Sequence, residues 1–183
     1  MGETKRYSGV AMLLHWLIAI AVIVNWRLAE AADHTDVRAD AEAYMGNHMA
    51  IGITILVLTL VRLAWRLGHP APPLPADYVT WERLLARTVH FIFYALLIGL
   101  PLGGWLASSF YGQGVDVFGL FTLPALPVAE SPNIGEEIFD LHGTGGEAML
   151  ILIGLHVLGA IKHMVIDKDG NLWRMLPFGT PKA

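Results

Sequence analysis

Residues 141–161 read LHGTGGEAMLILIGLHVLGAI, and this stretch decides the fold. It is apolar and long enough to cross a hydrocarbon core about 30 Å thick as one helix, and it contains two histidines, His142 and His156. Their 14-residue spacing returns to nearly the same helix face and corresponds to about 21 Å along the axis. The two imidazoles are therefore predicted to point the same way at two depths. Ionisable side chains at membrane depth are candidates for a functional site.

Three further apolar stretches complete the set of membrane spans, at residues 10–26, 49–67 and 88–111. The chain is 55% hydrophobic and 15% charged, whereas a soluble domain carries about 25% charged residues. This composition excludes a soluble, disordered or fibrous protein. The prediction is an all-α transmembrane four-helix bundle, a single domain over residues 1–183 with both termini on one side. A proline-rich stretch, residues 68–81, is predicted to be an extended loop between the second and third spans.

The basic residues lie mostly on one side of these spans. All Lys and Arg residues except Arg27 and Arg38 fall at the N-terminus, the second connection or the C-terminal tail, so the positive-inside rule predicts that both termini are cytoplasmic. The first span resembles a signal peptide in its basic start and its Ala-Glu-Ala sequence at residues 29–31, but its length and its His15 and Trp16 favour a retained span. The two outer connections are acidic and carry Glu30, Asp33, Asp36, Asp40, Glu42, Asp116, Glu130, Glu136, Glu137 and Asp140.

Five histidines are expected at membrane depth. They are His15 in the first span, His48 opening the second, His90 opening the third, and His142 and His156 in the fourth. Because the second span enters from the outer side, His48 matches His142 in depth. His15 lies near the inner end of the first span and matches His156. The sequence therefore predicts two facing pairs, His48 with His142 and His15 with His156, one in each leaflet.

Two imidazoles facing each other across a helix bundle are typical of haem b, whose iron takes an axial nitrogen on each face. The chain has no cysteine, which excludes thiolate ligands, Fe–S clusters, disulfides and c-type haem attachment. Two alternatives remain open: histidines that bond across closely packed helices, and a divalent-metal site, for which Glu147 is the only carboxylate well inside a span. Small residues that suit a flat macrocycle stand near each predicted ligand: Ala11, Ala19, Gly52, Gly145, Gly146, Gly159 and Ala160.

Short motifs recur along the whole chain in a characteristic order. They are LHW at 14–16, NH at 47–48 with Gly52, VRL at 61–63, His90, PLGGW at 101–105, LHG at 141–143, GLH at 154–156, KH at 162–163, DKDG at 167–170 and RMLP at 174–177. In this order the chain resembles the bacterial cytochrome b561 family, small four-helix di-haem proteins of the inner membrane. The resemblance implies two b-type haems, ligated at the four paired histidines. It also implies electron transfer between the quinone pool and the outer face, and for some members the oxidation of superoxide with ubiquinone as acceptor.

Charge and depth suggest further site residues. Arg62, 14 residues from His48, and Arg6 are predicted partners of haem propionates at the inner level. His90, Lys162 and His163 are candidate quinone contacts or haem neighbours.

The expected partners are the lipid bilayer, a quinone, and either superoxide or a cationic periplasmic electron carrier. The acidic outer connections disfavour attraction of the superoxide anion, so the cationic carrier stays open as the outer partner. Two further functions fit the same residues: a haem-bearing membrane anchor for a separate redox partner, and a non-redox divalent-metal membrane protein. No nucleic acid is expected, and the chain has no dinucleotide-binding fingerprint.

Overall fold

A computed structural model describes residues 6–72 and 80–179 of the chain. Four long helices dominate the described residues: α1 (Gly9–His34), α2 (Arg38–Gly68), α3 (Thr80–Phe110) and α4 (Pro132–Lys162). Each has the length and hydropathy of a membrane span. The predicted all-α four-helix architecture is therefore confirmed. The predicted extended loop between α2 and α3 falls largely on residues 73–79, which lie outside the described residues.

The helices extend beyond the predicted spans. α2 begins at Arg38 and α4 at Pro132, so His48 and His142 each lie ten residues inside their helices, and His90 lies ten residues inside α3. The expectation that His48 and His90 open their helices was wrong. The extra turns form because Ala and Glu propagate a helix well once it has been nucleated, and in α2 the exposed pair Arg38–Glu42 (2.7 Å) adds an i,i+4 contact.

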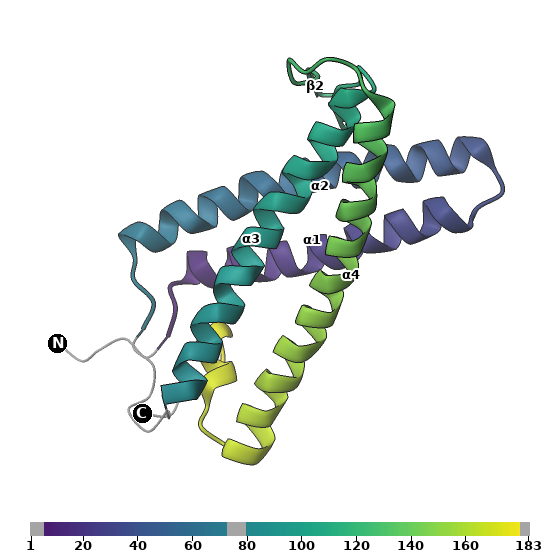
Figure 1. Cartoon of the computed structure of the whole chain (residues 1–183). Coiled ribbons are helices and arrows are strands. Elements are labelled where there is room, and N and C mark those ends of the chain that lie inside the picture. The colour runs from purple at the N-terminus through teal and green to yellow at the C-terminus, as the bar shows by residue number, and fades with distance from the viewer. Residues whose placement is uncertain (1–5, 73–79, 180–183) are drawn as a thin grey trace.

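The helices form two antiparallel pairs that cross. α1 packs along α2, α3 packs along α4, and the main contact between the pairs is made by α2 and α3. Figure 1 shows that the pairs cross steeply, so that the α1–α2 connection and the α3–α4 connection diverge. The buried core takes one residue from each helix: Ile18, Ile55, Leu97 and Met149.

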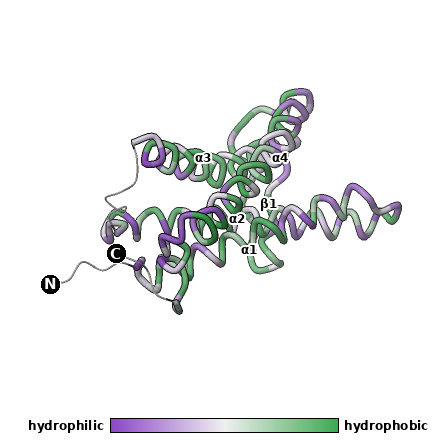
Figure 2. The backbone as a smooth tube through the Cα atoms, turned by 90° about the horizontal axis from the view of Figure 1, so that it is seen from below, coloured by the Kyte–Doolittle hydropathy of each residue, from purple (hydrophilic) through white to green (hydrophobic). Residues whose placement is uncertain are grey.

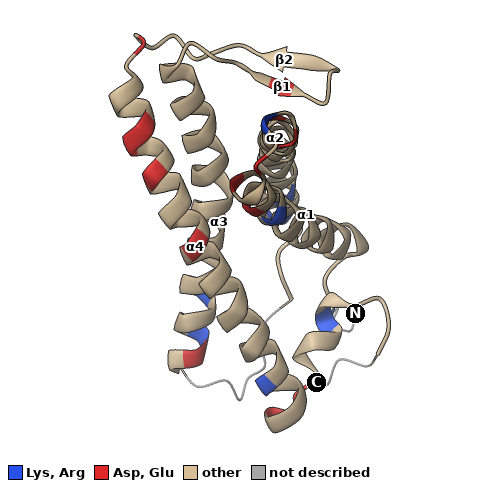
Figure 3. Ribbon diagram, turned by 90° about the vertical axis from the view of Figure 1, so that its right-hand side faces the viewer, with Lys and Arg blue, Asp and Glu red and all other residues tan. Residues whose placement is uncertain are grey.

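A short β-hairpin in the α3–α4 connection was not predicted. β1 (Val115–Val117) pairs antiparallel with β2 (Phe121–Leu123). The inward-facing Val115 and Val117 pack against Ile53 of α2, and Figure 3 shows the hairpin lying over α2. The hairpin therefore joins the two helix pairs at the end that we call the hairpin end.

The opposite end, called here the terminal end, holds the start of α1 and the end of α4 (Figure 1). After α4 the chain continues through a π-helix, η1 (His163–Asp167), and a 3-10 helix, η2 (Asn171–Met175). The tail then packs back on the start of the chain, where Tyr7 N donates to Arg174 O (3.2 Å) and Trp16 Nε1 donates to Met175 O (2.9 Å).

The exterior is apolar along the middle of the helices, as Figure 2 shows by hydropathy. Large exposed side chains there include Leu13, Ile20, Phe91, Ile151 and Leu158. Such a contiguous apolar surface is unusual for a soluble monomer and suits contact with lipid.

Candidate functional site

His48 and His142 face each other near the hairpin end. Their ring centres lie 5.9 Å apart with planes inclined by 76°. His48 Nδ1 lies 3.0 Å from the carbonyl oxygen of Asn25, and His142 Nδ1 lies 2.9 Å from that of Leu100. A carbonyl accepts a hydrogen bond only from a protonated Nδ1, which leaves Nε2 of each ring unprotonated and able to bind a metal.

His15 and His156 form the second pair, toward the terminal end. Their ring centres lie 6.3 Å apart with planes inclined by 71°. Phe93 of α3 packs edge-on against His156 at 5.4 Å, and Arg62 Nη1 lies 3.1 Å from His15 Nδ1. The structure thus brings together both predicted pairs and places Arg62 beside the second. Their role as ligands stays a prediction.

The spacing of both pairs fits one metal ion held between two imidazoles. With a metal–nitrogen bond of about 2.0 Å and about 1.15 Å from nitrogen to ring centre, two rings on opposite sides of one ion have centres about 6.3 Å apart. The observed separations are 5.9 and 6.3 Å.

Two of the predicted glycines leave space beside the histidines. A Cβ added at Gly146, beside His142, or at Gly159, beside His156, would meet nothing within 4 Å. A Cβ at Gly145 would instead lie 2.6 Å from Leu100 Cδ2, so Gly145 allows close packing of α4 on α3. At the hairpin-end pair the donor set therefore fits haem; at the other pair Arg62 can only donate to His15 Nδ1, so binding of a metal by His15 Nε2 requires Arg62 to leave that nitrogen.

Between the two pairs lies the apolar core. Ile55 is seven residues from His48, and Met149 is seven residues from both His142 and His156. Seven residues correspond to about 10.5 Å of helix rise. The two histidine levels are therefore separated by packed hydrocarbon.

Two other predicted residues have different settings. Arg6 donates to the carbonyl oxygens of Pro177 (3.0 Å) and Gly179, so its guanidinium holds the C-terminal tail and contacts neither histidine pair. His90 Nδ1 bonds to the carbonyl oxygen of Ala86 in its own helix (2.6 Å). His90 is nevertheless close enough to His15 and to His156 for their charges to interact with its own. This proximity agrees with the inner level predicted for His90.

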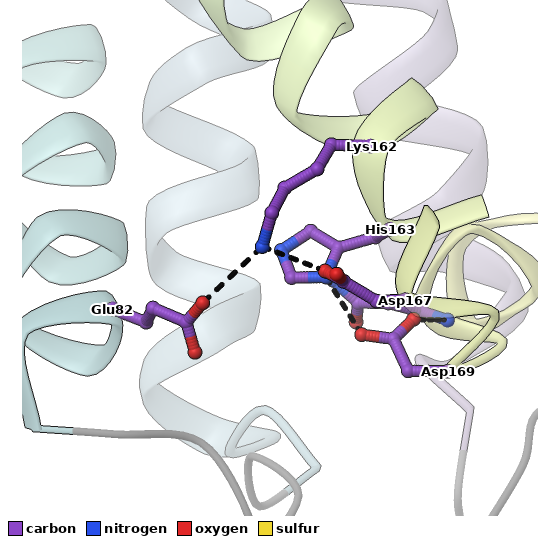
Figure 4. Close-up of polar contacts among 6 residues, drawn as sticks. Glu82, Lys162, His163, Asp167 and Asp169 are labelled. Atoms are coloured by element: carbon purple, nitrogen blue, oxygen red, sulfur yellow. Dashed lines mark hydrogen bonds and ion pairs between the residues drawn. The ribbon is translucent and has the colours of Figure 1, made fainter. Parts of the chain in front are cut away.

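Lys162 and His163 lie in a cluster of ion pairs at the terminal end (Figure 4). Lys162 Nζ contacts Glu82 Oε1 of α3 (3.3 Å) and Asp167 Oδ2 (2.8 Å). His163 Nδ1 lies 3.0 Å from Asp167 Oδ2 and 2.7 Å from Asp169 Oδ2. The π-turn of η1 brings these groups together, and π-helical turns are frequent at functional sites.

Sequence reasoning missed several of these partners. The carbonyl oxygens of Asn25 and Leu100 carry no signal in a sequence, since every residue has one. Glu82 did carry a signal, because it is an acidic residue close to the basic Arg83 and Arg87 in the first turns of α3.

The fold defines a class, membrane proteins built from four long apolar helices, and the two histidine pairs have a spacing that fits a metal cofactor. Comparison with known proteins specifies the class further. Residues 6–178 match the family model described as "Prokaryotic cytochrome b561".

Curated relatives agree with this match. The chain is 32% identical over 176 residues to "Cytochrome b561 homolog 2" of Escherichia coli, covering 94% of this chain and 92% of that protein. It is 33% identical over 180 residues to "Probable superoxide oxidase CybB" of Yersinia pestis, covering 94% and 97%. It is 28% identical over 184 residues to "Cytochrome b562" of Cereibacter sphaeroides, covering 96% and 98%.

The chain therefore belongs to the prokaryotic cytochrome b561 family. It is a multi-pass bacterial membrane protein that binds haem b and takes part in electron transfer.

Proposed function

We propose that the chain binds two haem b groups and moves single electrons between the periplasmic face of the inner membrane and the quinone pool. The observation that carries the proposal is the presence of two facing histidine pairs, with ring centres 5.9 and 6.3 Å apart, on two levels of one bundle. Haem bound by two histidines supplies one-electron chemistry and has no open position for oxygen. The apolar layer between the two levels keeps water away from the path.

The charge distribution supports an orientation with the hairpin end in the periplasm and both termini in the cytoplasm. The ten acidic residues of the two hairpin-end connections stand against Arg27 and Arg38 there, and Arg38 is itself paired with Glu42. Figure 3 shows acidic residues, in red, along the hairpin-end part of α4 and basic residues, in blue, toward the opposite end of the molecule. This is the asymmetry expected from the positive-inside rule.

At the terminal end, we assign some side chains to a haem propionate and others to a quinone. Arg62, beside His15, supplies a fixed positive charge for an anionic propionate. Lys162, His163 and His90 are our candidates for hydrogen bonds to the carbonyl oxygens of ubiquinone, the proposed diffusible partner. The ion pairs of Lys162 with Glu82 and Asp167 hold its ammonium group at that end.

Superoxide is one candidate electron donor, and it is supported by the similarity to a protein named "Probable superoxide oxidase CybB". The acidic periplasmic surface repels an anion, which favours as the alternative outer partner a cationic electron carrier that either donates or accepts the electron. Ionic strength distinguishes them. If superoxide is attracted by a local positive field, added salt slows its reduction of the protein; an unchanged or faster rate contradicts such attraction.

Haem stoichiometry tests the main proposal. The purified protein is expected to show a bis-histidine b-type spectrum with two haems per chain. His48→Ala and His142→Ala should each remove the hairpin-end haem, and His15→Ala and His156→Ala the terminal-end haem. One haem or none in well-folded protein would contradict the proposal.

A further inference from the structure

A cavity of about 370 Å³ opens between α2 and the β-hairpin. Its α2 wall is a face of small residues, which explains the hollow, and its other wall comes from the hairpin that Figure 3 shows over α2. The lining residues are Ala43, Gly46, Asn47, Ala50, Asp116 and Phe118. Asn47 directly precedes His48, so the cavity stands at the level of the hairpin-end histidine pair.

Asp116 and Asn47 supply acceptor oxygens to this cavity. Asp116 Oδ2 accepts the Gly119 amide (2.8 Å), and within residues 6–72 and 80–179 no donor is paired with its other carboxylate oxygen. Asn47 Nδ2 donates one of its two hydrogens to the carbonyl oxygen of Ala43 (2.9 Å), and its amide oxygen adds an acceptor. Phe118 adds a half-exposed ring. Acceptor oxygens beside an aromatic ring suit a cation.

The backbone that presents Phe118 is strained. Leu120 N bonds to Val117 O (3.1 Å) and closes a turn whose central residues, Phe118 (φ 57°) and Gly119 (φ 70°), both have positive φ. Asn is the usual first residue of such a turn, and a bulky residue there costs about 1–2 kcal/mol. Strain of this kind is concentrated at binding sites. An exposed ring held at this cost beside the cavity therefore points to a contact.

The charges around the cavity select the kind of partner. Asp33 of α1, Asp36 of the α1–α2 connection, and Asp40 and Glu42 of α2 are exposed on the segment that leads to the α2 wall of the cavity, and Glu42 is paired there with Arg38. Anionic lipid headgroups are repelled by such a surface, whereas a basic protein is attracted to it. We propose that the cavity and its acidic rim dock a basic, soluble electron-carrier protein, with one lysine or arginine side chain entering beside Asp116 and Phe118. The inference rests on the proposed electron exchange at the periplasmic face.

The probe for the test is a basic cytochrome c with Met/His ligation, whose raised potential makes it an acceptor. The chemically reduced protein in nanodiscs is mixed with ferric cytochrome c. The protein loses one electron, the cytochrome gains it, and no proton moves. The rate should fall steeply as ionic strength rises. Equilibrium binding of zinc-substituted cytochrome c, which is redox-inert, gives a second readout that does not depend on electron transfer.

Three charge variants locate the contact. Asp116→Asn keeps an oxygen for the Gly119 amide but removes the charge, and it should weaken binding about fivefold at low salt, the weight of one charge pair about 4 Å apart in water. Asn47→Asp adds a charge and should strengthen binding by a similar factor. Glu137→Gln, exposed on α4 and outside the cavity lining, is the matched control for net charge and should have a much smaller effect.

The substitution Phe118→Asn distinguishes a role of Phe118 in docking from a role in folding. Asn suits the turn, so the thermal stability of the protein should stay unchanged or rise, while cytochrome c binding should weaken severalfold. A loss of stability without a loss of binding would assign Phe118 a structural role and overturn the proposal.

Some results with the charge variants would overturn the docking proposal. Binding that is insensitive to salt and to Asp116→Asn, or equally weakened by Glu137→Gln, excludes docking at the cavity. A Phe118→Asn effect seen only in anionic nanodiscs, with cytochrome c binding intact, would place the hairpin on lipid. Failure of quinone reduction with cytochrome c binding intact would refute the proposed quinone step alone.

Discussion

Gly104 of α3 offers a direct test of the hairpin-end site. A Cβ added there would lie 3.3 Å from His142 Cε1, which is closer than an ordinary van der Waals contact, and 3.5 Å from His142 Nδ1. In Gly104→Ala the His142 ring has to move by a few tenths of an ångström. The movement disturbs the Nδ1 contact with the Leu100 carbonyl oxygen, now 2.9 Å.

The expected magnitude follows from the role of that contact. Loss of a hydrogen bond that orients a metal-binding histidine typically lowers metal affinity by about 10- to 100-fold, and a tenfold loss corresponds to about 1.4 kcal/mol. We expect Gly104→Ala to lower the affinity of the hairpin-end haem at least tenfold and to leave the terminal-end haem in place. Haem titration into the apoprotein, followed in the Soret band, and the haem-to-protein ratio after purification measure the effect.

Gly103→Ala is the matched control. A Cβ at Gly103 would meet nothing within 4 Å, and both substitutions make the same change in intrinsic helix propensity, about 1 kcal/mol in favour of Ala. Gly103→Ala should therefore keep both haems. Wild-type affinity in Gly104→Ala, or equal losses in the two variants, would refute the reasoning about His142.

Two further predictions concern the terminal-end site and the core. Arg62→Gln removes the positive charge beside His15 and should lower the midpoint potential of the terminal-end haem by about 60 mV, a tenfold change for one electron, while the other potential stays the same in a spectroelectrochemical titration. An equal shift in both potentials would argue against a local effect. Met149→Ala opens a cavity in the core beside Ile18 and Ile55 and should lower the unfolding free energy by about 2–5 kcal/mol, measured by denaturant titration in detergent. If the unfolding free energy changes by less than the experimental error, the surrounding helices have moved in to fill the cavity.

The amino-acid sequence was sufficient to predict which histidines come together in pairs. Helix rise is a local property of the backbone, so a 14-residue spacing sets both the face and the separation of His142 and His156. Hydrophobic length locates the spans in the same way. The four-helix class and the juxtaposition of His48 with His142 follow from these local quantities.

The tertiary structure decided what stands around the histidines. The steep crossing of the helix pairs (Figure 1) and the carbonyl oxygens that fix His48 and His142 depend on how distant segments pack, because crossing angle and helix rotation are set by many side chains together. The same holds for the cavity beneath the β-hairpin and for the η1 turn that unites Lys162 with Asp167. Periodicity along one segment carries no information about which atoms of another segment will face it.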